Sequence, residues 1–153
     1  MTAQENEALG RQFVKDVWND HDLDAIDELF SPDYTGHWFE FGGEDVDRAG
    51  LKGFVENVFE GFPDYTMDIE YVHADEELVT VGFTGGGSHE GEFYGIPPTG
   101  KSAATSQPTP GIMSMRVEDG QFVEGWATWD ALGMLQDLEI IPSDFSQAVS
   151  AED

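Results

Sequence analysis

Apolar residues recur at helical spacing in the first third of the chain. Between residues 2 and 19 they return every three or four positions, which predicts an amphipathic helix. Its apolar positions are Leu9, Phe13, Val14, Val17 and Trp18. The same spacing predicts a shorter helix over residues 23–30 and a third over residues 47–59, with Asp47 as its N-cap.

From residue 65 onward the apolar period changes from helical to two, which predicts β-strands. Strands are expected over residues 33–38, 65–73, 78–84, 102–116 and 122–129, with a glycine-containing loop over residues 39–44. Asp119 and Gly120, between the last two strands, form a dipeptide typical of tight hairpin turns. Helices gathered at one end of an antiparallel sheet make an α+β domain, which is the fold class that we expect.

The length of 153 residues suits one domain with room for a core and a ligand-sized cavity. We expect this domain to span residues 1–141 and residues 142–153 to form a polar, acidic tail. No stretch approaches the roughly twenty apolar residues that a membrane span needs. The first residues also lack the basic and apolar regions of a signal peptide, so a cytoplasmic location is expected.

The chain carries 32 acidic residues against 6 basic ones, a formal net charge of -26. Such a charge repels itself, and salt screens this repulsion over a Debye length of about 10 Å at 0.1 M and about 3 Å at 1 M. Because the acids are spread along the whole chain, we hypothesise a salty cytoplasm, as in a halophile, rather than one acidic partner-binding surface. The same charge argues against nucleic acids and anionic membranes as partners.

Several kinds of chemistry are excluded by residues that the sequence lacks. With no cysteine, the chain has no disulfide, thiolate nucleophile or zinc-thiolate site. The glycine run at residues 84–88 lacks the Lys-Ser/Thr that follows a phosphate-binding loop, and no Gly-x-Ser-x-Gly hydrolase motif occurs. Carboxylates, histidines and hydroxyl groups therefore remain as candidates for chemistry.

Asp130 is the first of these candidates, because it ends an aromatic strand just before a helix expected over residues 131–138. Along an unbulged strand Trp126 and Asp130 face the same side, so carboxylate and indole would share one wall. An acid in an apolar pocket is suited to proton transfer, since the loss of water disfavours its charged form. A simple N-cap of the following helix is an equally open alternative.

His89 and His37 each lie at the end of an expected strand. At such a place a histidine is a proton donor, an anchor for a substrate carbonyl, or a hydrogen-bonded, half-buried side chain. Together with Asp130 they would suit a metal ion by ligand type, but no local His-x-x-x-His spacing supports one. We expect neither a metal nor another cofactor.

Two segments carry a resemblance to a known family. They are residues 86–101, G-G-S-H-E-G-E-F-Y-G-I-P-P-T-G-K, and residues 118–135, E-D-G-Q-F-V-E-G-W-A-T-W-D-A-L-G-M-L. Both resemble the SnoaL-like polyketide cyclases, also called ester cyclases. Further similarity at residues 13–34 and 62–64 extends the resemblance over most of the chain.

The resemblance implies a nuclear transport factor two-like fold, in which a curved antiparallel sheet wraps around the N-terminal helices and forms a cone with a pocket. It also implies that Asp130 is the general acid/base, with His89 and His37 as pocket residues that hold a carbonyl group. A homodimer or homotetramer packed through the outer sheet face is implied as well. The aromatic wall of the pocket is expected to contain Trp126, Trp38, Phe13, Tyr34 and Phe93.

The function that we expect is cofactor-independent, aldol-type acid/base chemistry on a hydrophobic carbonyl compound, as in a cyclase or an isomerase. The alternative is a non-catalytic module of the same fold that binds a small apolar molecule or mainly dimerises. Pro108 and Pro110 fall where a strand is expected. A bulge or a rim loop at this place would change the mouth of the pocket.

Overall fold

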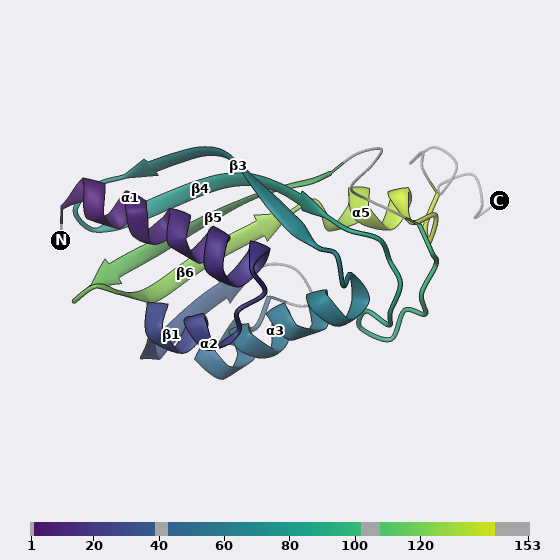
Figure 1. The fold of residues 1–153 in the computed structure, drawn as a ribbon, viewed down its shortest axis with the longest axis horizontal. Coiled ribbons are helices and arrows are strands. Elements are labelled where there is room, and N and C mark those ends of the chain that lie inside the picture. The colour runs from purple at the N-terminus through teal and green to yellow at the C-terminus, as the bar shows by residue number, and fades with distance from the viewer. Residues whose placement is uncertain (1, 39–42, 102–107, 143–153) are drawn as a thin grey trace.

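Six strands form one curved, unclosed sheet in the computed structural model of the protein, which describes residues 2–38, 43–101 and 108–142 (Figure 1). Their spatial order is β2-β1-β6-β5-β4-β3. Their bounds are Phe30–Trp38 (β1), Asp45–Val46 (β2), Thr66–Ala74 (β3), Leu78–Gly86 (β4), Thr109–Glu118 (β5) and Gln121–Trp129 (β6).

Four of the five pairings between these described strands are antiparallel, whereas β1 and β6 run parallel. The sheet is therefore mixed, and the expectation of a purely antiparallel sheet is corrected at this one place. Parallel neighbours need a long crossover connection, and the whole of α3, β3, β4 and β5 lies between β1 and β6 in the chain. The short strand β2, which pairs with β1, was not expected from the sequence.

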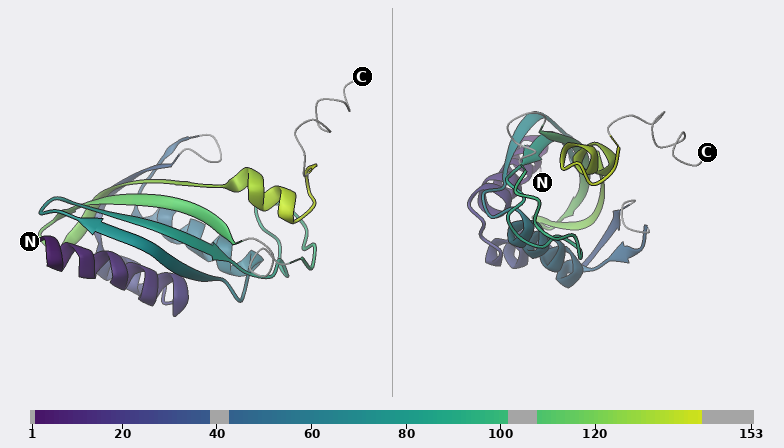
Figure 2. Two further views of the ribbon diagram at one scale, coloured as in Figure 1. Left: turned by 90° about the horizontal axis from the view of Figure 1, so that it is seen from above. Right: turned by 90° about the vertical axis from the view of Figure 1, so that its right-hand side faces the viewer.

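The N-terminal helices and α3 lie against the inner face of the curved sheet, and α5 follows β6 at one end of the molecule (Figures 1 and 2). In the end-on view of Figure 2 the sheet curls toward these helices, which confirms the expected cone-like α+β arrangement. None of the described helices is long and apolar enough to cross a membrane. The helix bounds are Ala3–Gln12 (α1), Asp24–Leu29 (α2), Arg48–Gly61 (α3) and Ala131–Asp137 (α5).

The sequence pattern predicted that the first helix would be α-helical throughout. The structure differs from this prediction. After α1 the chain continues as a π-helix, η1, over Phe13–Asn19, and the backbone N–H of Asp20 donates to the carbonyl of Lys15 at 2.9 Å. The five-residue spacing of a π-helix stacks Phe13 and Trp18 on one face, with ring centroids 6.2 Å apart. Both rings therefore point to the inside of the cone.

Two local signals in the sequence are confirmed. The Asp47 carboxylate accepts a hydrogen bond from the Gly50 backbone N–H at 2.8 Å and starts α3, which ends at Gly61, two residues later than expected. Asp119 and Gly120 have φ values of 51° and 77°, as a tight hairpin turn between β5 and β6 requires. The hydrogen bond at Asp47 and the backbone angles at Asp119 and Gly120 fix the start of α3 and the hairpin turn independently of the rest of the fold.

Three phenylalanines join the N-terminal helix to the first and last long strands. Phe13, Phe30 and Phe122 are at most 3% exposed, and their ring centroids lie 4.9 Å, 5.0 Å and 6.1 Å apart. Full burial of one such side chain contributes about 1.5–3 kcal/mol. This cluster holds the parallel strand pair against the helical layer.

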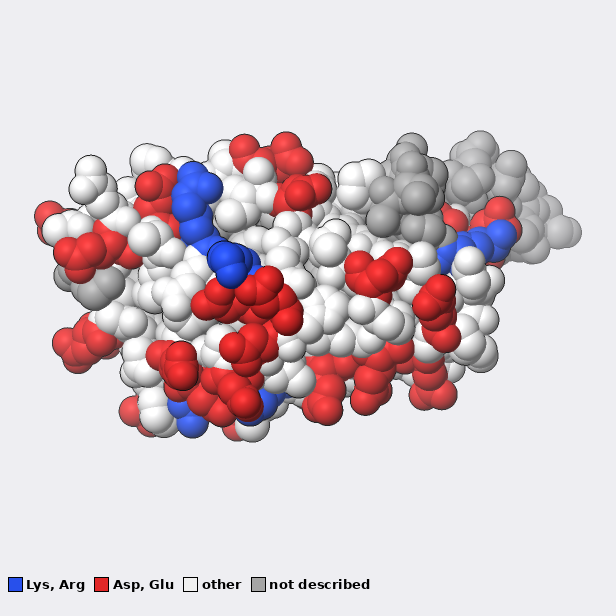
Figure 3. All heavy atoms as spheres, in the orientation of Figure 1, with Lys and Arg blue, Asp and Glu red and all other residues white. Residues whose placement is uncertain are grey.

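Acidic side chains are scattered over the face shown in Figure 3, with few lysines and arginines among them. Several expectations fall largely outside the described residues: the loop over residues 39–44, the first part of the strand over residues 102–116 and the tail over residues 142–153.

Candidate functional site

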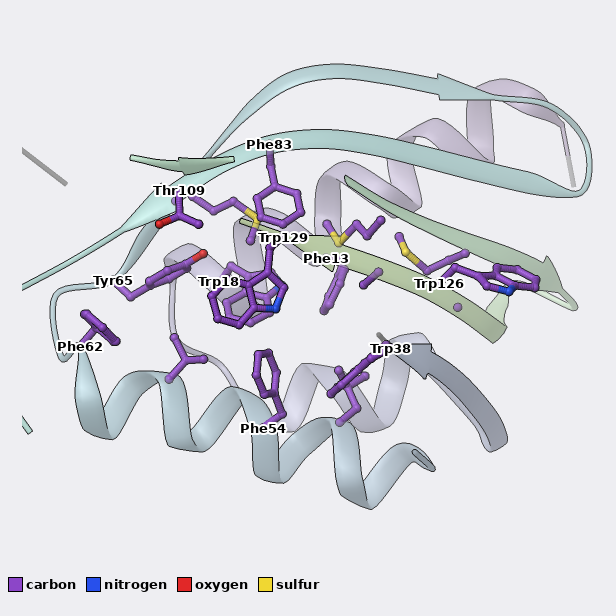
Figure 4. A pocket seen from close by; sticks show the side chains of 18 of the residues that line it. Phe13, Trp18, Trp38, Phe54, Phe62, Tyr65, Phe83, Thr109, Trp126 and Trp129 are labelled. Atoms are coloured by element: carbon purple, nitrogen blue, oxygen red, sulfur yellow. The ribbon is translucent and has the colours of Figure 1, made fainter. Parts of the chain in front are cut away.

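An aromatic cavity lies between the sheet and the helices (Figure 4). Together with the solvent at its mouth it holds about 1070 Å³ of space that no atom fills. Its walls come from the π-helix, α3, α5 and all long strands. The lining residues are Phe13, Trp18, Phe30, Tyr34, Trp38, Leu51, Phe54, Val58, Phe62, Tyr65, Met67, Phe83, Gly85, Gly86, Phe93, Thr109, Met113, Met115, Gly125, Trp126, Ala127, Trp129 and Met134.

All five residues expected in an aromatic pocket wall line this cavity. They are Phe13, Tyr34, Trp38, Phe93 and Trp126. Four of them, namely all except Trp126, have their rings packed among the other aromatic side chains. Trp126 borders the far end, where its indole ring packs beside His37 with ring centroids 5.5 Å apart (Figure 4).

The described lining contains no carboxylate, imidazole, ammonium or guanidinium group, since it includes no Asp, Glu, His, Lys or Arg. Its polar side-chain groups are the hydroxyls of Tyr34, Tyr65 and Thr109 and the indole N–H groups of the tryptophans. Uncharged, ring-containing molecules are the guests that such a wall favours.

Burial keeps both phenols in their neutral form. Burial raises the pKa of Tyr34 to about 12, although a hydrogen bond from the Trp38 indole N–H acts in the opposite direction. Burial also raises the pKa of Tyr65 well above its ordinary value near 10. Both hydroxyls therefore remain protonated hydrogen-bond donors at neutral pH.

Asp130 lies outside the cavity lining and caps α5. Its side chain is exposed, and Oδ1 accepts a hydrogen bond from the Gly133 backbone N–H at 2.9 Å. Residues alternate along β6 as expected, but the face turned to the cavity is that of Ala127 and Trp129. The residue instead lines a second groove, whose lining also includes Tyr71 and two aromatic residues of the cavity wall, Phe83 and Trp129.

Tyr34 and Trp38 of β1 both line the cavity and are an even number of residues apart, so they share the inner face. Because side chains alternate along a strand, His37, which directly precedes Trp38, lies on the outer face. Its Nε2 lies 2.7 Å from Glu124 Oε2, and its Nδ1 lies 2.9 Å from Asp45 Oδ1. The hydrogen bond to Glu124, followed by that to Asp45, raises the pKa of His37 above its ordinary value. The imidazole is thus held by two carboxylates away from the cavity.

His89 is fully buried behind the cavity wall. Its Nδ1 accepts from the Thr99 backbone N–H at 3.2 Å, and its ring stacks on Phe62, with centroids 5.2 Å apart. Burial lowers the pKa of His89, so the neutral imidazole is favoured. Phe62 separates it from the cavity that Phe62 itself lines. The backbone of His89 is also hydrogen-bonded to the backbone of Gly100 and of Lys101. These bonds hold together the two ends of the loop that connects His89 to Gly100.

The structure therefore does not bring His37, His89 and Asp130 together. Within the described ranges, no group of three or more histidines and carboxylates is arranged to hold a metal ion. Sequence reasoning gave no cavity role to Trp18, Tyr65 or Trp129, which line the middle of the space in Figure 4. The alternation of side chains along β6 could have identified Trp129 as a cavity residue, since it places Trp129 on the other face of the strand from Asp130.

The model of one protein family, SnoaL-like polyketide cyclase, matches residues 8–138. The chain belongs to the SnoaL-like polyketide cyclase family. No curated protein matches the chain at a significant level.

Solved structures share the SnoaL-like fold over almost the whole chain. A candidate SnoaL-like polyketide cyclase from Jannaschia sp. CCS1 is 22% identical, with a TM-score of 0.80 over 92% of this chain and 96% of that one. AclR, a candidate hydroxylase from Streptomyces galilaeus, is 26% identical, with a TM-score of 0.81 over 99% and 91%. IdmH, a candidate polyketide cyclase from Streptomyces antibioticus, is 28% identical, with a TM-score of 0.74 over 86% and 96%. The SnoaL-like fold thus occurs with differently described activities.

Proposed function

We propose that this SnoaL-like protein binds a hydrophobic, ring-containing carbonyl compound in the aromatic cavity and promotes its ring closure or isomerisation without a cofactor. The observation that carries the proposal is the cavity itself, whose described wall is almost entirely aromatic and aliphatic. Such a wall holds flat apolar molecules in a fixed orientation, which favours reactions within one molecule. Membership of the cyclase family supports this class of reaction.

Asp130 is the proton carrier in this proposal, and it acts from the mouth of the cavity. Residues on both sides of it, Trp129 and Met134, line the cavity, so the carboxylate lies close to the edge of the wall. To reach a ligand it has to release the Gly133 backbone N–H that it now accepts. His37 and His89 do not touch the cavity, so we assign ligand contact to neither of them.

A non-catalytic binding module is the second candidate. It is favoured by the absence of any carboxylate, histidine, lysine or arginine side chain from the described cavity lining. In that case the protein holds the same kind of molecule but leaves its bonds unchanged, and Asp130 serves only as the cap of α5. A homodimer, implied by the family resemblance, stays a prediction for either function.

The first test follows proton exchange on an enolisable ring ketone. We choose 2-tetralone as the probe and measure the incorporation of deuterium next to its carbonyl group by NMR in D₂O. If the protein acts as a cyclase-type acid/base, it accelerates this exchange above the buffer rate, and Asp130→Asn reduces the acceleration about a hundredfold. The affinity for 2-tetralone should be retained in the variant.

Asp130→Asn is the informative variant because asparagine also caps helices well, so the hydrogen bond from Gly133 can persist while the charge is lost. Asp130→Ala serves as the matched control, since it removes both cap and charge and lowers the free energy of unfolding by about 0.5–2 kcal/mol. Binding without accelerated exchange in the wild-type protein would reject the enzyme and leave the binding module. Equal exchange rates for wild type and Asp130→Asn would reject Asp130 as the proton carrier.

A further inference from the structure

The indole N–H of Trp18 is a buried donor without an acceptor. Trp18 is only 6% exposed, and its Nε1 has no hydrogen-bond partner among the described residues. The indole group lines the cavity, between the rings of Phe54, Phe59 and Tyr65. Trp38, by contrast, uses its N–H to donate to Tyr34. A buried donor that stays unpaired destabilises a protein, so an unpaired donor in a side chain that lines a cavity is a candidate to bind an acceptor on a ligand.

The π-helix explains why this donor is there. Asn19, the last residue of η1, donates to the Met67 carbonyl at 3.0 Å and accepts from the Met67 N–H at 2.7 Å. This pair of hydrogen bonds fixes the end of the helix to β3, one residue after Trp18. The wide π turn and its anchor hold the indole in the cavity wall.

Tyr65 supplies a second polar group beside Trp18. The two ring centroids are 5.4 Å apart, and Figure 4 shows the hydroxyl end of Tyr65 directed toward the interior of the cavity. Gly85 lies against this hydroxyl, because a Cβ at that position would collide with the Tyr65 oxygen. Burial keeps this phenol protonated, as described above, so it too can donate.

We propose that Trp18 and Tyr65 form a donor pair that binds the carbonyl oxygen of an uncharged ring ligand. The inference rests on the proposed function, because it names the groups that recognise the ligand in the same cavity. A carbonyl oxygen has two lone pairs and can accept from both donors. A carboxylate or an ammonium group on the buried part of the ligand is disfavoured, because the described wall offers no counter-charge.

The test compares two tricyclic probes that differ in one carbonyl group, fluorenone and fluorene. Their dissociation constants are measured by quenching of tryptophan fluorescence in the wild-type protein and in Trp18→Phe, which keeps an aromatic ring but removes the N–H. We expect Trp18→Phe to weaken fluorenone binding by about three- to tenfold and fluorene binding by less than about twofold. Tyr65→Phe should act in the same selective way.

Trp38→Phe is the matched control, since it removes an indole from the same wall whose N–H is already bonded to Tyr34. It should change the affinities for the two probes by the same factor. A fluorenone that bears a carboxylate should bind more weakly than fluorenone itself, as the uncharged wall requires.

The infrared carbonyl band of bound ¹³C-labelled fluorenone gives a readout that does not depend on affinity. Donation from Trp18 and Tyr65 lowers the band frequency relative to an apolar solvent, and Trp18→Phe moves it part of the way back. An unshifted band, or equal effects of Trp18→Phe on both probes, would overturn the donor pair while leaving the cavity intact as a binding site. Failure of both probes to bind would overturn the proposed function and this inference together.

Discussion

The two faces of β1 and β6 carry opposite chemistry although they belong to the same two strands. On the inner face, Tyr34 and Phe122 are at most 4% exposed and belong to an apolar wall. On the outer face, Glu124 accepts hydrogen bonds from Arg116 at 2.9 Å and lies 2.7 Å from His37. One step along a strand therefore decides whether a group meets the cavity or the charged surface.

The backbone itself forms part of the inner wall where it contains glycine. At Gly125 in β6 a Cβ atom would come within 2.6 Å of the Tyr34 hydroxyl oxygen. The ring of Tyr34 can lie flat against the strand only because this side chain is missing. The inner face thus combines large rings with a bare backbone, whereas the outer face carries the charged side chains of His37, Glu124 and Arg116.

Truncating a buried side chain on the inner face should have the largest effect on stability. Phe122→Ala removes a ring that is 0% exposed, and we expect it to lower the free energy of unfolding by about 3–5 kcal/mol. The matched change on the outer face is Ile112→Ala, at a β5 residue that is 47% exposed, with an expected loss below about 1 kcal/mol. Chemical denaturation of both variants measures the difference. Similar losses would contradict the assignment of the faces.

Screening the charge of the outer surface should have an intermediate effect. None of the described residues that line the cavity carries a charge, so the self-repulsion of the net charge of -26 should act at the surface and be relieved by salt. We expect the melting temperature to rise between about 0.1 M and about 3 M KCl, by roughly 2–4 °C for each kcal/mol of relieved repulsion. Differential scanning calorimetry at these two salt concentrations checks it, and an unchanged melting temperature would refute the halophile hypothesis.

The outer-face pair of His37 and Glu124 should have the smallest effect, and one that depends on pH. Hydrogen bonds to Glu124 and then to Asp45 raise the pKa of His37, so its stabilising effect is complete below the ordinary value of 6.5 and is lost as pH rises through the raised value. A hydrogen bond from His37, followed by one from Arg116, lowers the pKa of Glu124, so its effect is present above 4.5 and is lost as pH falls through the lowered value. Both effects are complete between pH 4.5 and pH 6.5.

His37→Gln should therefore destabilise the protein more at about pH 6 than at about pH 9, by on the order of 0.5 kcal/mol, as is usual for exposed pairs. Denaturation curves at the two pH values measure this difference. In a Glu124→Gln background most of it should vanish, since the stronger partner of His37 is gone. A larger loss at the higher pH would contradict the sign of the His37 shift.

Most of the secondary structure could be predicted from the sequence because it depends on neighbouring residues. The cap at Asp47 and the turn at Asp119 are set by local hydrogen bonds and backbone angles. The change from α-helix to π-helix at Phe13 could not be predicted in this way, because the apolar spacing up to Trp18 suits both helices. The anchor on β3 that ends the π-helix is a contact between distant residues.

The wall of the candidate site could be predicted better than its chemistry. Alternation separated the two faces of β6, but both faces contain a tryptophan, so sequence alone did not show which one turns inward. Trp129 lines the cavity with its neighbours on the inner face, while Trp126 borders the cavity only at its far end, beside His37. The cap at Asp130 was one of two open alternatives in the sequence. The burial of His89 depends on Thr99, across a loop whose path the sequence did not specify.

The parallel pairing of β1 with β6 also has a consequence for folding kinetics. Phe30 lies opposite Phe122, about ninety residues later in the chain, so this pairing closes one of the longest loops in the domain. The antiparallel strands β3 to β6 are joined to their sequence neighbours and can assemble first. The cavity is complete only when β1 docks, so we expect the ligand that we propose to bind the finished fold and none of its precursors. Its binding should shift the folding equilibrium toward that last step and stabilise the native state by an amount that grows with the logarithm of the ligand concentration above the dissociation constant.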